Sequence, residues 1–155
     1  MDTFEDALYT RNWDGNFYRK NFITFCPEVE GNTSRSLYTL ENDKEVLGCV
    51  EIKRKKDNME VFLLEVAPAH SLYNPNRKTK YIGETLLSFL ATLAQSENKD
   101  LIIIDIADRE KTKTFYQQCG FKNCGKDSAI LSYNRLDNLI SQNEIHTGAK
   151  IELIG

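Results

Sequence analysis

The chain is poor in the residues from which metal sites and disulfide frameworks are built. Its 155 residues include two histidines and four cysteines, and no two cysteines form a Cys-x-x-Cys pair. Structural metal sites usually combine about four such ligands at short spacing. We therefore expect no metal, and we expect the cysteines to be reduced and mostly buried thiols: Cys26, Cys49, Cys119 and Cys124.

Long apolar runs and an excess of positive charge are also missing. No apolar stretch approaches the ~20 residues of a membrane-spanning helix, and the acidic N-terminus MDTFEDALYT lacks a signal-peptide pattern. The net charge of −3 provides no overall attraction to nucleic acid. We expect one soluble, cytoplasmic domain over residues 1–155, without a membrane or nucleic-acid partner.

The readable part of the chain begins with three strand patterns. They cover residues 37–42, 46–54 and 59–68 and are joined by short polar turns, which is typical of an antiparallel meander. Residues 1–36 are the least legible, because the aromatic-rich stretch 17–25 fits a helix or a strand.

The second half changes to a helical period. Apolar residues predict an amphipathic helix over 82–96, and the run LIIIDIA at 101–107 predicts a buried strand. A short helix over 111–119 and a closing antiparallel pair, FKNCG with SAILSYNRL, complete an α+β fold. Residues 137–155 are expected to be a C-terminal extension, with KIELI at 150–154 as a candidate last strand.

Two segments present groups that could bind or react. The loop that leads to the helix at Ile82 contains Arg77, Lys78 and Lys80, and a helix N-terminus beside basic residues suits a phosphate. The strand FLLEVAP places Glu65 on the face of Leu63 and opposite to that of Leu64, so a desolvated carboxylate could act as a general base. The alternatives are an exposed basic loop and a solvent-facing glutamate.

The segment FYQQCGF at 115–121 and the residue His70 complete the candidates. Phe115 and Phe121 are expected in the core, and Gly120 is expected to end the helix. Tyr116 either points toward a cleft or is one more core aromatic. His70 is a rival base just past the strand, or a polar surface residue.

Together these features resemble the GNAT-family N-acetyltransferases, over roughly residues 37–135. The parts LEVAP, YIGETLL and FYQQCGF carry the resemblance, and the Glu-x-Ala-Pro variant is similar to a branch of small bacterial or phage-type enzymes. The family implies a mixed, mostly antiparallel central sheet with helices on both faces. It also implies acetyl-CoA as co-substrate, without a metal.

The resemblance assigns roles to particular residues. The pantetheine arm would lie along the strand backbone at Leu64, Glu65 and Val66. Tyr116 would sit near the thioester sulfur as proton donor, and Glu65 would deprotonate the amine. The pyrophosphate would rest on backbone amides of the loop and first helical turn, here Lys78, Lys80, Tyr81, Ile82, Gly83, Glu84 and Thr85.

The implied function is transfer of an acetyl group to a primary amine of a small molecule or peptide, by direct attack in a ternary complex. The chain departs from the family because Tyr81 stands where the motif has glycine, so the loop is expected either to bend differently or to tolerate less close contact with the cofactor. A degenerate module that binds CoA or a protein partner, and an unrelated α+β interaction module, are the alternatives. A homodimer is plausible.

Overall fold

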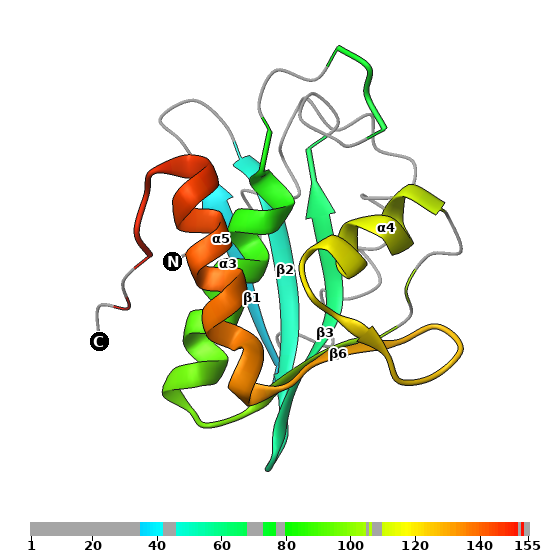
Figure 1. Ribbon diagram of the computed structural model, residues 1–155, viewed down its shortest axis with the longest axis vertical. Coiled ribbons are helices and arrows are strands. Elements are labelled where there is room, and N and C mark those ends of the chain that lie inside the picture. Colours follow the sequence, from blue (N-terminus) through cyan, green and yellow to red (C-terminus); the bar gives the residue numbers. More distant parts are fainter. Residues whose placement is uncertain are drawn as a thin grey trace.

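The computed structural model describes residues 35–41, 46–67, 73–76, 80–104, 106, 110–151 and 153. Six strands and three α-helices lie in these ranges (Figure 1): β1 Arg35–Glu41, β2 Val46–Arg54, β3 Asn58–Val66, α3 Ile82–Ser96, β4 Asp100–Ile103, α4 Glu110–Gln118, β5 Lys122–Asn123, β6 Ala129–Leu131 and α5 Leu136–Thr147.

The strands form one sheet in the order β1-β2-β3-β4-β6-β5. The pairs β1–β2, β2–β3, β4–β6 and β5–β6 are antiparallel, and only β3–β4 is parallel. The parallel pair is connected through α3, as a crossover between parallel strands requires. The predicted α+β fold with a mixed, mostly antiparallel sheet is confirmed.

Helix α3 lies directly on β2 and β3. A Cβ atom added to Gly48 of β2 would lie 2.7 Å from the carbonyl oxygen of Glu65 and 2.9 Å from Cδ1 of Leu86. The absence of a side chain at Gly48 therefore sets how closely the helix approaches the sheet. Around this contact the apolar side of α3 is buried in the main core, through Leu86, Leu87, Leu90 and other residues.

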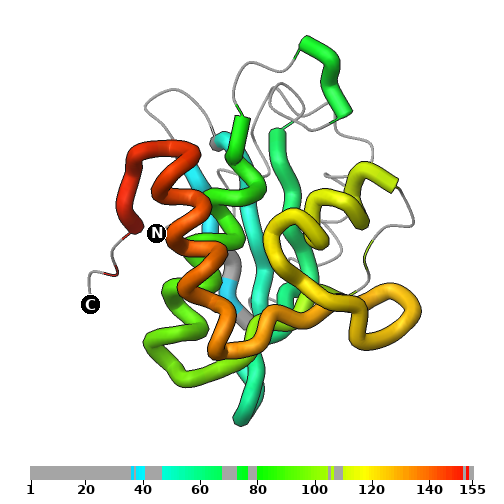
Figure 2. The backbone as a smooth tube through the Cα atoms, viewed as in Figure 1, coloured from blue at the N-terminus to red at the C-terminus, as the bar shows by residue number. Residues whose placement is uncertain are grey.

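Helix α5 packs alongside α3 in the opposite direction, as the tube in Figure 2 also shows. Thr85 near the start of α3 donates to Asn143 near the end of α5, and Gln95 near the end of α3 donates to Asp137 at the start of α5. Two leucines of α5, Leu136 and Leu139, are fully buried in the core. This helix was missed: residues 137–155 were predicted only to be a C-terminal extension with a candidate last strand at 150–154.

Most of the other predicted elements agree with the structure to within a few residues, but the closing strand predicted at SAILSYNRL covers only Ala129–Leu131. The strand at 46–54 and the helix at 82–96 are confirmed at both ends. The strand predicted over 101–107 ends at Ile103, and the described residues 150, 151 and 153 of the predicted last strand are in no strand. The segment 17–25 lies outside the described residues. No helix in the described part of the chain is long and apolar enough to span a bilayer.

The close approach at Gly48 predicts that Gly48→Ala destabilises the protein. The added methyl group would meet backbone as well as a core leucine, so overpacking should lower the free energy of unfolding by about 1–3 kcal/mol. Urea unfolding of both proteins measures this difference. Gly125→Ala is the control, because the nearest atom there is the Ser128 hydroxyl oxygen, which can rotate away. Equal losses in the two variants would contradict the assignment.

Candidate active site

Strand β3 separates from β4 halfway along its length. The two strands are in register only from Asn58↔Asp100 to Val61↔Ile103, while β3 continues to Val66 beside β2. The β2–β3 register steps from Leu63 to Val61 and skips Phe62, which is a β-bulge. A bulge bends its strand, so the bend lies where β3 leaves β4.

The separation leaves the second half of β3 with one edge that no described strand covers. The N–H of Ala67 donates to the carbonyl of Leu47, which fixes the backbone groups of Ala67 and Glu65 toward β2. Because backbone groups alternate along a strand, those of Leu64 and Val66 point the other way. We call this side, at Leu64 and Val66, the free edge of β3. Of the three residues predicted to meet the pantetheine arm, Leu64 and Val66 have backbone groups that face it.

The side chain of Glu65 is buried on the sheet face opposite to α3. Glu65 is 4% exposed, and neither carboxylate oxygen has a hydrogen-bond partner in the described part of the chain. It stands across from Cys49, and Glu51 is buried on the same face. Burial raises the pKa of the Glu65 carboxyl to about 8. Once ionised, a carboxylate with this pKa is a stronger base than an ordinary glutamate, which suits a general base that works near pH 8.

The N-cap side chain of α3 makes no capping hydrogen bond to the first turn of the helix. Tyr81, the N-cap residue, has φ 69° and ψ 15°, which is the left-handed conformation, and makes no side-chain cap hydrogen bond. The first helical bond runs from the N–H of Thr85 to the carbonyl of Tyr81. The N–H groups of Ile82, Gly83 and Glu84 precede that bond in the helix. Tyr81 thus adopts a conformation that glycine adopts readily, while residues 77–79 of the loop lie outside the described residues.

Helix α4 covers Gly83 from the side. A Cβ atom at Gly83 would lie 3.1 Å from Cζ of Phe115, so the glycine makes room for this half-buried ring. Tyr116 is 8% exposed and belongs to the core, where its ring contacts those of Phe115 and Phe121. Burial raises the pKa of the Tyr116 phenol further above its ordinary value. Phe121 is in the core as predicted, whereas Phe115 only packs against it.

Three predicted cofactor residues direct their side chains to α5. Glu84 pairs with His146, Thr85 donates to Asn143, and the ring of Tyr81 stacks on the imidazole of His146. Only the backbone of these residues could serve the predicted phosphate site. Sequence reasoning missed His146 and Asn143, and their place on one side of a helix, three residues apart, was the available signal.

The loop between β3 and α3 is described in part. Tyr73 shares a hydrogen bond with Thr112 of α4, and the Lys111 ammonium lies 5.7 Å from the centre of the Tyr73 ring. Lys80 is exposed. The predicted candidates Lys78 and His70 lie outside the described residues. This loop therefore reaches α4, which also supplies the aromatic rings next to Gly83.

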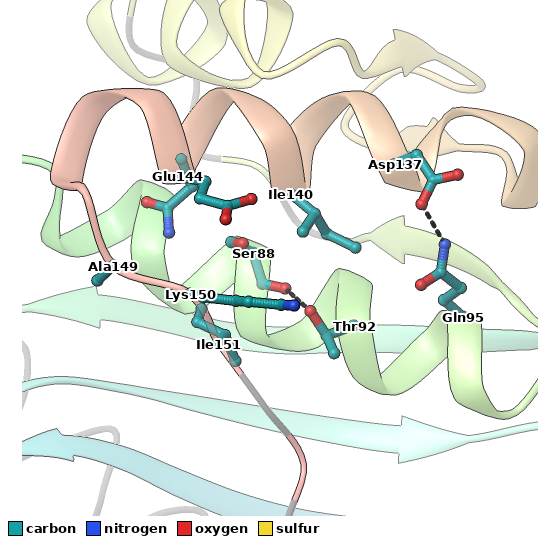
Figure 3. Close-up of a pocket in the computed structure, with 10 residues that line it drawn as sticks. Ser88, Thr92, Gln95, Asp137, Ile140, Glu144, Ala149, Lys150 and Ile151 are labelled. Atoms are coloured by element: carbon teal, nitrogen blue, oxygen red, sulfur yellow. Dashed lines mark hydrogen bonds between the residues drawn. The ribbon is translucent and has the colours of Figure 1, made fainter.

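A cavity of about 160 Å³ lies elsewhere, between α3, α5 and residues 149–151 (Figure 3). Ser88, Ile140 and Lys150 are among its lining residues. None of the predicted site residues lines it, so it is separate from the free edge of β3. No group of three or more metal-ligating side chains occurs in the described ranges.

Comparison with known proteins finds likeness in structure. No protein-family model matches the chain, and no curated protein has a similar sequence. PaiA N-acetyltransferase from Thermoplasma acidophilum, solved with coenzyme A, aligns with a TM-score of 0.53 and 16% identity over 83% of this chain and 87% of that chain. A GNAT acetyltransferase from Elizabethkingia anophelis with acetyl-CoA bound aligns with a TM-score of 0.53 and 18% identity over 79% and 69%.

A higher TM-score comes from the AtaT–AtaR complex bound to DNA. It reaches 0.63 at 19% identity, over 84% of this chain and 90% of that chain. At such low identity the likeness shows the fold, which is that of the GNAT acetyltransferases. The fold expected from LEVAP, YIGETLL and FYQQCGF is confirmed.

The buried carboxyl of Glu65 predicts a pH-dependent stability. Its pKa is raised from 4.5 to about 8 in the folded protein. The folded state therefore holds the proton that the unfolded state loses, and stability falls as pH rises from 4.5 through 8. Glu65→Gln removes the charge, so it should exceed the wild type in free energy of unfolding by roughly 1–3 kcal/mol at pH 9. Denaturation at pH 5 and pH 9 measures this. A difference that does not grow with pH would contradict the assignment.

Proposed function

We propose that this chain, which has the fold of the GNAT N-acetyltransferases, transfers an acetyl group from acetyl-CoA to a primary amine of a small molecule or peptide. One observation carries the proposal. The free edge of β3 and the N-terminus of α3 lie at the two ends of the loop that joins them, and a Cβ atom at Gly48 would lie close to both Glu65 and Ile82, so an extended ligand with an anionic end can meet both.

The cofactor would be bound mainly by backbone. The pantetheine amides would pair with Leu64 and Val66, as an added strand pairs with a sheet edge. The pyrophosphate would accept from the N–H groups of Ile82, Gly83 and Glu84, where the helix dipole favours negative charge. Lys78 and Lys80 would add positive charge from the preceding loop.

Glu65 would be the base that prepares the amine. An alkylammonium has a pKa near ~10.4 and cannot attack the thioester until it loses a proton. A carboxylate whose pKa is about 8 accepts that proton, directly or through water, better than an ordinary glutamate. The amine nitrogen then forms a bond to the acetyl carbon, and the carbon–sulfur bond breaks from the tetrahedral intermediate.

Tyr116 would protonate the departing sulfur. Burial raises its pKa, so the phenol is fully protonated at physiological pH and has a proton to give, which solvent then replaces. The backbone N–H of Val66, on the free edge, would polarise the thioester carbonyl. Positioning of the two substrates supplies much of the rate in such a ternary complex.

Ligand-dependent stability tests the cofactor assignment. Acetyl-CoA at about 100 times its dissociation constant should stabilise the protein by about 2.7 kcal/mol and raise its Tm visibly. CoA should act similarly and ATP should not. No shift at millimolar acetyl-CoA would refute the cofactor site and favour a module that binds a protein partner, as in the structure of the AtaT toxin bound to the C-terminus of AtaR.

Two substitutions test catalysis once an amine acceptor is found. Glu65→Gln should lower kcat/KM about 10²-fold to 10⁴-fold and remove an ascending pH limb near 8, and Tyr116→Phe should lower kcat while CoA still binds. Steady-state kinetics over pH 6–10, together with calorimetric CoA binding, measures both. Wild-type turnover in both variants would assign these residues to the core only.

A further inference from the structure

The C-terminal turn of α5 is fastened to the first turn of α3 by a polar cluster. Nδ1 of His146 lies 2.9 Å and 3.0 Å from the two carboxylate oxygens of Glu84, and the rings of His146 and Tyr81 stack with centres 4.7 Å apart and planes at 22°. Next to Glu84, Thr85 donates to Asn143, which lies one turn before His146 in α5. The Glu84 side chain is 7% exposed and that of His146 is 33% exposed.

Glu84 stands at a position from which a glutamate normally caps its own helix. With Tyr81 as N-cap, Glu84 is the third helical residue. A glutamate there can fold back and accept from the N-cap backbone N–H, as in a capping box. Here the Glu84 carboxylate binds the imidazole of His146 instead. Since a carboxylate has no proton to donate, Nδ1 of His146 is the donor. The Glu84 carboxylate is thus held at His146 and not at the N-terminal backbone of its own helix.

The stacked ring also bears on the conformation of Tyr81. A non-glycine residue in the left-handed region carries a backbone cost of roughly 1–2 kcal/mol, so it needs support from its surroundings. The imidazole of His146 lies against the Tyr81 ring and supplies such support. His146 of α5 therefore contacts both Glu84 and Tyr81, and these two residues decide whether the first turn of α3 can receive an anion.

We propose that His146 is a positioning residue for the cofactor: it holds the Glu84 carboxylate away from the N-terminal amides of α3 and so keeps that turn available to the pyrophosphate. The inference rests on the proposed function. Without His146, Glu84 would cap its own helix and place a negative charge where the pyrophosphate binds. Loss of His146 should therefore weaken CoA binding through the Glu84 carboxylate, and removing Glu84 as well should restore the affinity.

Calorimetric titration of CoA into variants of the full chain tests this. His146→Ala should weaken CoA binding by about tenfold, which corresponds to about 1.4 kcal/mol. The double variant His146→Ala with Glu84→Ala should return to within about threefold of the wild type, because the competing carboxylate is gone. His146→Gln, which keeps a donor for Glu84, should also bind CoA nearly normally, and it serves if His146→Ala folds poorly.

The matched control lies at the other end of the same helix pair. Gln95→Ala removes the hydrogen bond to Asp137, so it loosens α3 against α5 far from the first turn, and CoA affinity should not change. If His146 acted only through helix packing, the double variant would bind CoA no better than His146→Ala, and that result would overturn the proposal, as would unchanged affinity in His146→Ala. A wild type that does not bind CoA would instead refute the proposed function itself.

Discussion

The parting of β3 from β4 is the constraint on which the rest of the structure depends. Four residue pairs hold the two parallel strands together, and the bulge at Phe62 turns β3 away immediately afterwards. A strand that leaves its neighbour inside a sheet loses hydrogen bonds, and buried backbone groups without partners are costly. A ligand that pairs with the edge at Leu64 and Val66, as proposed for the pantetheine arm, would supply such partners.

Two glycines let helices approach this gap. Gly48 brings α3 onto β2 and β3, close enough that an added Cβ would meet the carbonyl of Glu65. Gly83 lets Phe115 of α4 lie against the first turn of α3. The packing fixes where the helix N-terminus points relative to the free edge of β3. The glycine that the motif associates with ligand approach thus has a packing role of its own.

The sequence could predict what depends on local pattern. The regular spacing of apolar residues predicted the observed ends of β2 and α3. The alternation of side chains along a strand predicted that Glu65 lies on the face opposite to Leu64. Helix α5 was missed because two of its inward positions are polar, Asn143 and His146, which interrupt the apolar stripe. The left-handed Tyr81 could not be predicted either, since its stacking partner lies far away along the chain and the substitution of glycine by tyrosine indicates a different turn.

Asn143 and His146, which interrupt the apolar pattern of α5, are also the residues that connect this helix to the first turn of α3. Leucines of α5 enter the core near the start of the helix, whereas Asn143 and His146 meet Thr85 and Glu84 at its end. Apolar burial would hold α5 in place without specifying what its last turn does. Buried polar pairs cost more when they are broken than they contribute when they are formed. They therefore fix the geometry of one helix end more strictly than apolar contacts would, at the end where the proposed cofactor site needs an unoccupied row of backbone donors.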